Sequence, residues 1–155
     1  MPHRGLSCHA AIIKGIYFMK YPFILTPDGP GYMVTFPDIP EAITYGRTKT
    51  EAIGLAYDCL ITALDFYFDD MRMVPVPSAQ ADGQHVVALP PSIAIKVELL
   101  NEIVRRHVKQ ADLARLMKLS PTQVNRMVNL RQATKVDTIG LAFQKLGKSL
   151  EFHVA

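Results

Sequence analysis

Residues 110–129 read QADLARLMKLSPTQVNRMVN, and this stretch decides how the C-terminal half is interpreted. Two short helices that meet at a tight turn need apolar side chains at fixed positions. Counted from Gln110, the fourth, eighth, tenth, fifteenth and eighteenth positions are all apolar: Leu113, Met117, Leu119, Val124 and Met127. Ala114, at the fifth position, is small where the helices approach most closely. We therefore predict a helix, a tight turn and a second helix.

The second predicted helix has its own start signal. Ser120 offers a side-chain oxygen to the free N–H groups of the first turn, and Gln123 completes the S-x-x-Q spacing of a capping box. Pro121 falls at the first helical position, where the N–H that proline lacks has no helical partner. With Val124 and Met127 turned inward, a polar face is left outward.

That outward face carries side chains suited to contacting DNA bases: Pro121, Thr122, Asn125, Arg126 and Asn129. In a major groove Arg pairs with guanine, Asn pairs with adenine, and the methyl group of Thr can contact thymine. Gln110 begins the first helix, where free backbone N–H groups favour a phosphate. The predicted DNA-binding residues are Gln110, Ser120, Pro121, Thr122, Gln123, Asn125, Arg126, Asn129, Arg131 and Lys135. The alternative is a helical hairpin that serves only packing or dimerisation.

Over residues 92–150 the chain resembles the helix-turn-helix regulators related to Cro and the phage repressors. The likeness continues past the two helices in NLRQATK at 129–135 and LAFQKLGKSL at 141–150. Lys118 departs from the pattern, because this family usually has Gly at that turn position, where a positive φ mildly strains other residues. The resemblance implies a dimer that places two recognition helices in successive major grooves, about 34 Å apart.

The N-terminal half begins with an alternating pattern typical of strands. Tyr21, Phe23 and Leu25 are spaced by two, and the same period returns at residues 32–36. Residues 27–31, PDGPG, interrupt the pattern, so we expect a hairpin with a loop of about five residues. Further strands are expected at residues 41–46, at either 74–76 or 85–89, and at 150–154.

A helix follows the third expected strand. Thr48 and Glu51 form the T-x-x-E pattern of a capping box, in which the carboxylate reaches back to the cap. Spacings of three and four predict a buried face made of Ile53, Ala56, Tyr57, Leu60, Leu64 and Phe68. Asp69 and Asp70 help to end the helix, because negative charge opposes the dipole at a helix C-terminus. Another helix is predicted from residue 92 to about residue 106.

Residues 21–70 resemble the N-terminal domain of HicB-type antitoxins. The likeness is carried by G-Y-x-V-x-F-P-D-I-P at residues 31–40 and by G-x-T-x-x-E-A at residues 46–52, and the order of parts matches over residues 19–155. The resemblance implies a partial ribonuclease-H-like fold that binds and masks a small basic RNA-cleaving toxin, HicA. It also implies that the antitoxin represses its own operon through its C-terminal domain.

Charge divides the 155 residues into unlike parts. Residues 19–85 carry four basic and nine acidic side chains, whereas residues 86–155 carry eleven basic and five acidic ones. An acidic half suits a basic protein and a basic half suits nucleic acid, although chance and solvated surface would also give such a division. The predicted organisation is an N-terminal extension at 1–18 with Met19 as an alternative start, a toxin-binding domain at 19–76, a linker at 77–84 and a helix-turn-helix domain at 90–155.

Other classes of function lack the residues that they need. Two cysteines are too few for a disulfide scaffold, and no apolar run approaches the roughly 18 residues that cross a bilayer, so we expect a cytoplasmic protein without a membrane partner. His3, Cys8 and His9 are too few and too irregularly spaced for a metal site. No phosphate loop or nucleotide motif is present, so no cofactor is expected. A metal-dependent nuclease needs converging carboxylates, and the strands expected at 23–26 and 32–36 carry none.

The fold class predicted from the sequence is α+β: an N-terminal partial ribonuclease-H-like domain, with antiparallel strands plus one long helix, joined to a C-terminal all-α helix-turn-helix domain. The expected function is that of an antitoxin and autorepressor rather than an enzyme. Its expected partners are a HicA-like toxin, double-stranded operator DNA, and further copies of the chain in a dimer or higher oligomer. The alternative is a stand-alone repressor whose N-terminal domain senses a ligand or oligomerises. A metal-dependent nuclease is the third interpretation.

Overall fold

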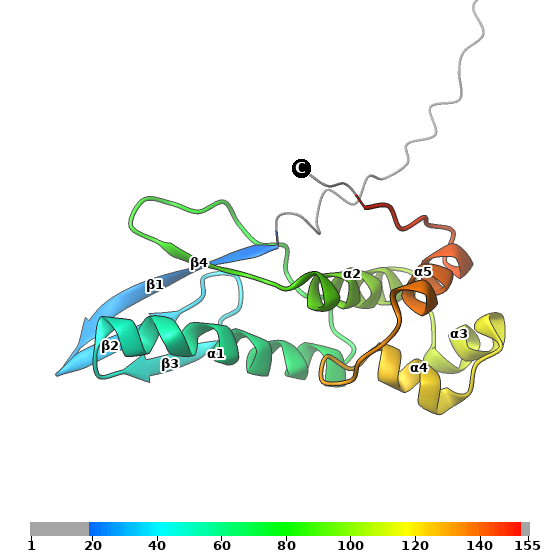
Figure 1. Ribbon diagram of the computed structural model, residues 1–155, viewed down its shortest axis with the longest axis horizontal. Coiled ribbons are helices and arrows are strands. Elements are labelled where there is room, and N and C mark those ends of the chain that lie inside the picture. Colours follow the sequence, from blue (N-terminus) through cyan, green and yellow to red (C-terminus); the bar gives the residue numbers. More distant parts are fainter. Residues whose placement is uncertain (1–18, 153–155) are drawn as a thin grey trace, which may run out of the picture.

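A computed structural model describes residues 19–152, and this part of the chain forms four strands and five helices (Figure 1). The sheet contains β1 (Lys20–Asp28), β2 (Gly31–Thr35), β3 (Ile43–Gly46) and β4 (His85–Ala88), in the spatial order β3-β2-β1-β4. All neighbouring strands are antiparallel. The predicted α+β class is therefore confirmed. None of the described helices is long and apolar enough to cross a membrane.

The first hairpin is tighter than the sequence predicted. Strand β1 continues through Pro27 and Asp28, which pair with Tyr32 and Gly31, so only Gly29 and Pro30 form the turn. The predicted loop of five residues is wrong, because a proline can remain in a strand where its missing N–H is not needed by the ladder. Residues 23–26 carry no carboxylate, as expected, but β1 extends beyond them to Asp28, so the observed strand ends in one.

Helix α1 (Lys49–Asp69) covers one face of the sheet and begins with the predicted cap. Thr48 Oγ1 accepts a hydrogen bond from the Glu51 N–H at 3.1 Å. The Glu51 carboxylate accepts from the N–H of Arg47 at 2.7 Å rather than from the cap residue, which corrects the predicted capping box by one position. Both contacts satisfy N–H groups that the start of a helix would otherwise leave without partners.

Two residues predicted to be buried on α1 are exposed. Ile53 and Tyr57 are 41% and 39% accessible, whereas Ala52 and Ala56 face the sheet. A Cβ atom added to Gly46 of β3 would lie 2.4 Å from the backbone nitrogen of Ala52. The start of α1 therefore approaches β3 too closely for large side chains, and the correct buried face contains Ala52, Ala56, Leu60, Ile61, Ala63, Leu64, Tyr67 and Phe68.

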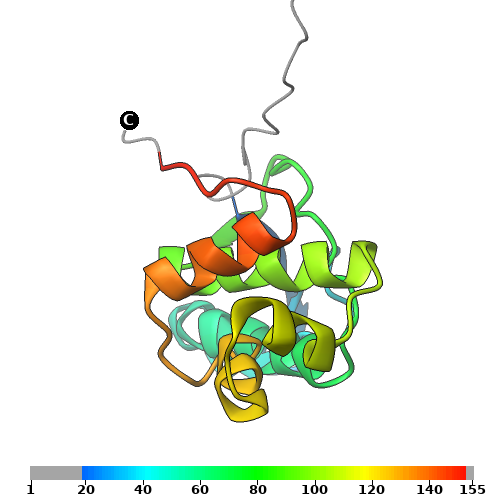
Figure 2. The ribbon, with the colours of Figure 1, turned by 90° about the vertical axis from the view of Figure 1, so that its right-hand side faces the viewer.

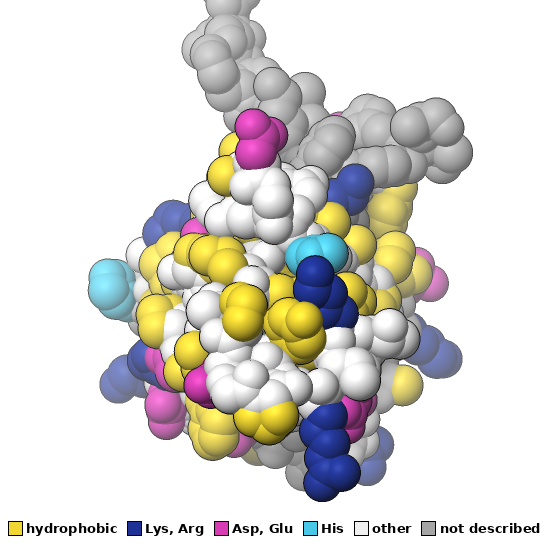
Figure 3. Space-filling model, turned by 90° about the vertical axis from the view of Figure 1, so that its left-hand side faces the viewer, with side chains coloured by type: hydrophobic (Ala, Val, Ile, Leu, Met, Phe, Trp, Pro, Cys, Tyr) yellow, Lys and Arg dark blue, Asp and Glu magenta, His cyan; other side chains and the backbone are white. Residues whose placement is uncertain are grey.

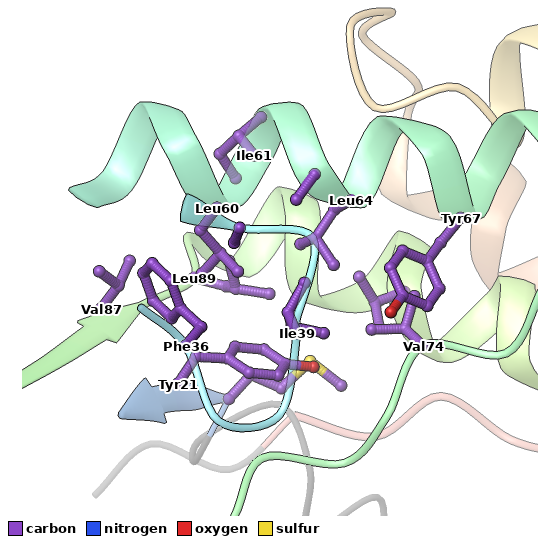
Figure 4. Packing of buried hydrophobic residues seen from close by; sticks show 14 of the residues in the cluster. Tyr21, Phe36, Ile39, Leu60, Ile61, Leu64, Tyr67, Val74, Val87 and Leu89 are labelled. Carbon is purple, nitrogen blue, oxygen red and sulfur yellow. The ribbon is translucent and has the colours of Figure 1, made fainter. Parts of the chain in front are cut away.

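The core between α1 and the sheet continues into the segment that follows the helix. Leu60, Leu64 and Tyr67 of α1 point toward aromatic and aliphatic side chains of the sheet and its connections (Figure 4). Val74 is also buried, and its N–H and C=O pair with the side-chain amide of Asn101 at 2.7 and 3.0 Å. Of the two expected positions for a further strand, residues 85–88 form β4, and residues 74–76 form no strand.

Four further helices complete the described chain: α2 (Pro91–Arg105), α3 (Gln110–Met117), α4 (Pro121–Met127) and α5 (Val136–Lys145). Figure 2 shows α2 and α5 lying side by side above α3 and α4. Helix α2 belongs to two cores: Ala94, Val97 and Leu100 pack with the sheet and α1, whereas Ile95, Leu99 and Ile103 pack with α3, α4 and α5. Residues 150–152 form no strand, and the rest of the strand expected at 150–154 lies outside the described residues, as does the extension at 1–18.

The opposite face of the sheet remains partly open. Ile24, Thr35 and Ile43 lie in one cross-strand row that points away from α1, and Ile24 and Ile43 are 36% and 58% exposed. Figure 3 shows the end of the molecule next to the β1–β2 turn, where apolar side chains lie among charged side chains of both signs. This end therefore carries no large surface of a single charge.

Candidate nucleic-acid interface

The junction between α3 and α4 forms at the predicted residues. Helix α3 ends at Met117, and Lys118 adopts a left-handed conformation with φ 55° and ψ 41°. Its N–H and that of Leu119 donate to the last carbonyls of α3, which is the usual way of closing a helix through a left-handed residue. The chain can then turn within three residues and begin α4 at Pro121.

Apolar side chains hold this helix pair against α2 and α5. Of the five predicted apolar positions, Leu113, Met117, Val124 and Met127 are at most 5% exposed, and Leu119 is half-buried against the same core. Ala114 is buried as well, so the two helices can approach closely. Because one side of α4 is fixed in the core, the opposite side faces solvent.

The exposed side of α4 carries four of the five residues that the sequence placed on the DNA-facing surface. Thr122, Asn125 and Arg126 are exposed, and so is Pro121. Asn129 differs, because α4 ends at Met127 and Asn129 is half-buried beyond the helix. Its Oδ1 accepts the N–H of Arg131 at 2.8 Å. The structure thus brings four of these residues together on one surface and holds the fifth, Asn129, in a turn.

Three other predicted site residues are engaged in hydrogen bonds within the protein. Ser120 Oγ accepts the Gln123 N–H at 3.2 Å, and Gln123 Oε1 accepts the Ser120 N–H at 2.9 Å, which confirms the predicted capping box. Gln110 lies at the start of α3, half-buried, and its amide donates to the sulfur of Met71 at 3.4 Å. Ser120 and Gln123 therefore determine where α4 begins.

The two predicted cations at this surface lie in different environments. Lys135 is exposed at the start of α5. Arg131 is exposed but pairs with Asp65 of α1, with 2.6 Å between a guanidinium nitrogen and a carboxylate oxygen. The two residues are 66 positions apart in the sequence, so no local pattern indicates that they pair.

Sequence analysis missed Lys96, which lies in α2 beneath the end of α4. The residue is only 4% exposed. Its Nζ donates hydrogen bonds to the carbonyl oxygens of Arg126 at 3.2 Å and Asn129 at 2.7 Å, and to that of Gln132. Burial lowers the pKa of this ammonium group. The only sequence signal is a lysine in the middle of the apolar run IAIKV at residues 93–97.

The described residues offer little to a metal-dependent nuclease. No group of three or more His, Cys, Asp or Glu side chains within residues 19–152 is arranged to hold a metal ion. Asp28 ends β1, whereas Asp65 is paired with Arg131 and Asp38 accepts hydrogen bonds from Ser78. His3, Cys8 and His9 lie outside the described residues. Nothing in this part of the chain supports the nuclease interpretation.

Comparison with known proteins identifies the class. Residues 20–98 match the family model of the HicB-like antitoxin of bacterial toxin–antitoxin systems. Antitoxin HicB 2 of Photorhabdus laumondii is 47% identical over 133 residues, which cover 86% of this chain and 94% of that protein. Antitoxin HicB of Escherichia coli strain K12 is 45% identical over 133 residues, covering 85% and 96%. Antitoxin HicB 1 of Photorhabdus laumondii is 41% identical over 152 residues, covering 97% and 95%.

These matches define the class of protein as an antitoxin of a bacterial toxin–antitoxin system. Within that class, the chain belongs to the HicB-like antitoxin family. The family comprises regulatory proteins rather than enzymes, and membership implies a toxin as partner. The resemblance seen in the N-terminal half of the sequence is thereby confirmed.

Proposed function

We propose that this antitoxin neutralises a HicA-type mRNA-cleaving toxin by direct protein binding and represses its own operon by binding operator DNA. In this proposal the N-terminal sheet and α1 bind the toxin, and α3 and α4 act as a helix-turn-helix. The observation that carries the DNA-binding part is the exposed row of Thr122, Asn125 and Arg126 on a helix whose other side is fixed in the core.

Helix α4 acts as the recognition helix in the major groove. Arg126 donates to a guanine, Asn125 pairs with an adenine, and the methyl group of Thr122 contacts a thymine. Lys135 contacts a phosphate. Gln110 also contacts a phosphate: its side-chain amide gives up the hydrogen bond to the Met71 sulfur and donates to a phosphate oxygen instead. Each phosphate contact made by a cation steepens the decline of affinity with salt.

A dimer binds an inverted repeat in this proposal. The two recognition helices then enter successive major grooves about 34 Å apart, on the same face of the duplex. The acidic character of residues 19–85 supports a basic protein as the partner of the N-terminal half. The stand-alone repressor is less well supported, because membership in an antitoxin family implies a toxin.

The test is to replace Arg126 by Ala in the full chain. The probes are a duplex from the region upstream of the chain's own reading frame and a random-sequence duplex of equal length. We expect Arg126→Ala to lose about 1–3 kcal/mol of preference for the upstream duplex, while co-expression with the operon's toxin still permits growth. Arg47→Ala, which removes another exposed arginine in the connection between β3 and α1, is the matched control for the DNA measurement. A folded Arg126→Ala protein that keeps its preference, or that also loses toxin neutralisation, contradicts the proposed division of labour.

A further inference from the structure

Lys96 connects α2 to the end of α4 through three hydrogen bonds. Its neighbours Ile95 and Val97 are buried in the two cores, and the lysine itself is 4% exposed. The acceptors are the carbonyl oxygens of Arg126, Asn129 and Gln132, which are all backbone atoms. An ammonium group has three donors, so each one has a partner here.

The three carbonyls lie in or after the last turn of α4, and those of Arg126 and Asn129 also accept the N–H groups of Asn129 and Gln132, both at 3.3 Å. The last C=O groups of a helix lack N–H donors from a following helical turn, so they can accept further hydrogen bonds, and the C-terminal end of the helix dipole favours a positive charge. Lys96 supplies both a donor and the charge. Burying a cation is unfavourable unless hydrogen bonds compensate for the lost water, so the arrangement depends on the carbonyls staying in place.

The contact matters because α4 is short. A helix of seven residues has little stability of its own, and its orientation depends on what holds its two ends. The capping box of Ser120 fixes the start. The end leads into residues 128–134, which are held by Lys96 and by the burial of Leu130 in the core beneath the sheet.

We propose that Lys96 is a positioning residue for DNA recognition, which fixes the end of α4 so that Thr122, Asn125 and Arg126 face the groove together. This inference rests on the proposed DNA binding. Lys96 contacts no DNA itself, because its ammonium group is buried beneath the helix. Its effect is therefore on sequence preference rather than on the attraction of phosphates.

The test replaces Lys96 by Met in the full chain, which keeps the unbranched stem and removes the donors. With the upstream and random-sequence duplexes as probes, we expect Lys96→Met to lose about tenfold in preference for the upstream duplex. The slope of log affinity against log salt should stay unchanged. In contrast, Lys135→Met should reduce that slope by about 0.9 and weaken both duplexes alike. A folded Lys96→Met protein with the wild-type preference overturns the proposal.

Amide hydrogen exchange tests the positioning role without DNA. In Lys96→Met, the amides of Val124 and Val128, which bond along α4, should exchange at least several-fold faster than in the wild type, whereas those of α5 should not change. If the Met variant does not fold, Lys96→Gln retains two donors and is measured in the same way. Unchanged exchange in α4 of the folded variant overturns the positioning role. A wild-type protein without preference for the upstream duplex refutes the proposed function instead, and the exchange result still decides the role of Lys96.

Discussion

The Asp65 carboxylate and the Arg131 guanidinium meet at 2.6 Å, which joins α1 to the segment that follows α4. Figure 1 shows the C-terminal part of α1 running toward that segment. The pair links the half that resembles the toxin-binding domain to the half proposed to bind DNA. The pair also limits the contacts of Arg131 with DNA, because its guanidinium is bonded to Asp65 in the free protein.

Breaking this pair should change DNA binding more than stability. Exposed ion pairs contribute about 0.2–1 kcal/mol, so Asp65→Asn should lower the free energy of unfolding in urea by no more than that. The freed Arg131 should add a phosphate contact and increase the salt slope of DNA binding by about 0.9. Asp58→Asn, which neutralises an exposed acid elsewhere on α1, is the control. An Asp65→Asn slope equal to that of the control would argue against a phosphate contact by Arg131.

Two glycines should respond in opposite ways to the same substitution. Gly46→Ala places a Cβ 2.4 Å from the Ala52 nitrogen, so α1 must move away from β3, and we expect a loss of about 1–3 kcal/mol. Gly54 lies inside α1 with nothing within 4 Å of an added Cβ. Gly54→Ala should therefore raise stability by about 0.5–1 kcal/mol. Urea unfolding measures both, and equal effects at the two positions would refute the close approach of α1 to β3.

Lys118→Gly should stabilise the protein. A left-handed conformation costs a residue with a Cβ roughly 1–2 kcal/mol, and the φ of Lys118 is 55°. Part of the gain is offset by the greater freedom of glycine in the unfolded chain, so a net rise of about 0.5–1 kcal/mol is expected. Lys145→Gly, at an exposed position within α5, should give no rise. Thermal unfolding of the two variants side by side checks this, and a lower melting temperature for Lys118→Gly would contradict it.

Two glutamates on α2 should alter the pH dependence of stability with opposite signs. Burial raises the pKa of Glu98, with Arg105 opposing and Glu102 adding to the rise. Burial also raises the pKa of Glu102, but the hydrogen bond from Arg106 and the charges of Lys148 and Arg105 outweigh it, so the net pKa is lowered.

A raised carboxyl pKa means that stability is lost as pH rises from the usual value of 4.5 through the folded value. Glu98→Gln should therefore be more stable than the wild type at pH 7, with the difference vanishing below pH 4.5. Glu102, with its lowered pKa, has the opposite effect: its carboxylate stabilises the folded protein near neutral pH, and this stabilisation is lost as pH falls through the folded-state pKa. Glu102→Gln should be less stable at pH 7, and the difference should shrink in acid. Urea unfolding from about pH 3.5 to 7 tests both, and parallel curves for the two variants would contradict the assignment.

Local signals in the sequence predicted local structure well. The capping box of Ser120 and Gln123 and the inward positions on α3 and α4 depend on spacings of three and four, and these were correct. The positive φ of Lys118 was expected from the resemblance to helix-turn-helix regulators, which usually have Gly at this position. Such features are determined by residues within one or two helical turns of each other.

The hairpin loop and the partner of Glu51 were local errors, but the other errors arose where distant parts of the chain meet. The burial of Ala52 in place of Ile53 depends on how closely β3 approaches α1, which no helical period contains. The partners of Arg131 and Gln110 lie 66 and 39 residues away. Lys96 was missed because a lysine is ordinarily exposed, and only the fold brings three carbonyl groups to its ammonium.

The membership of α2 in both cores limits how the protein can be dissected. A fragment that stops at the loop preceding β4 would lose Ala94, Val97 and Leu100 from beneath the sheet, together with the Asn101 amide that holds Val74. A fragment that begins at α2 would leave those same side chains open to water. Each half expressed separately would therefore expose apolar surface and tend to aggregate. The intact chain should unfold thermally in a single cooperative transition.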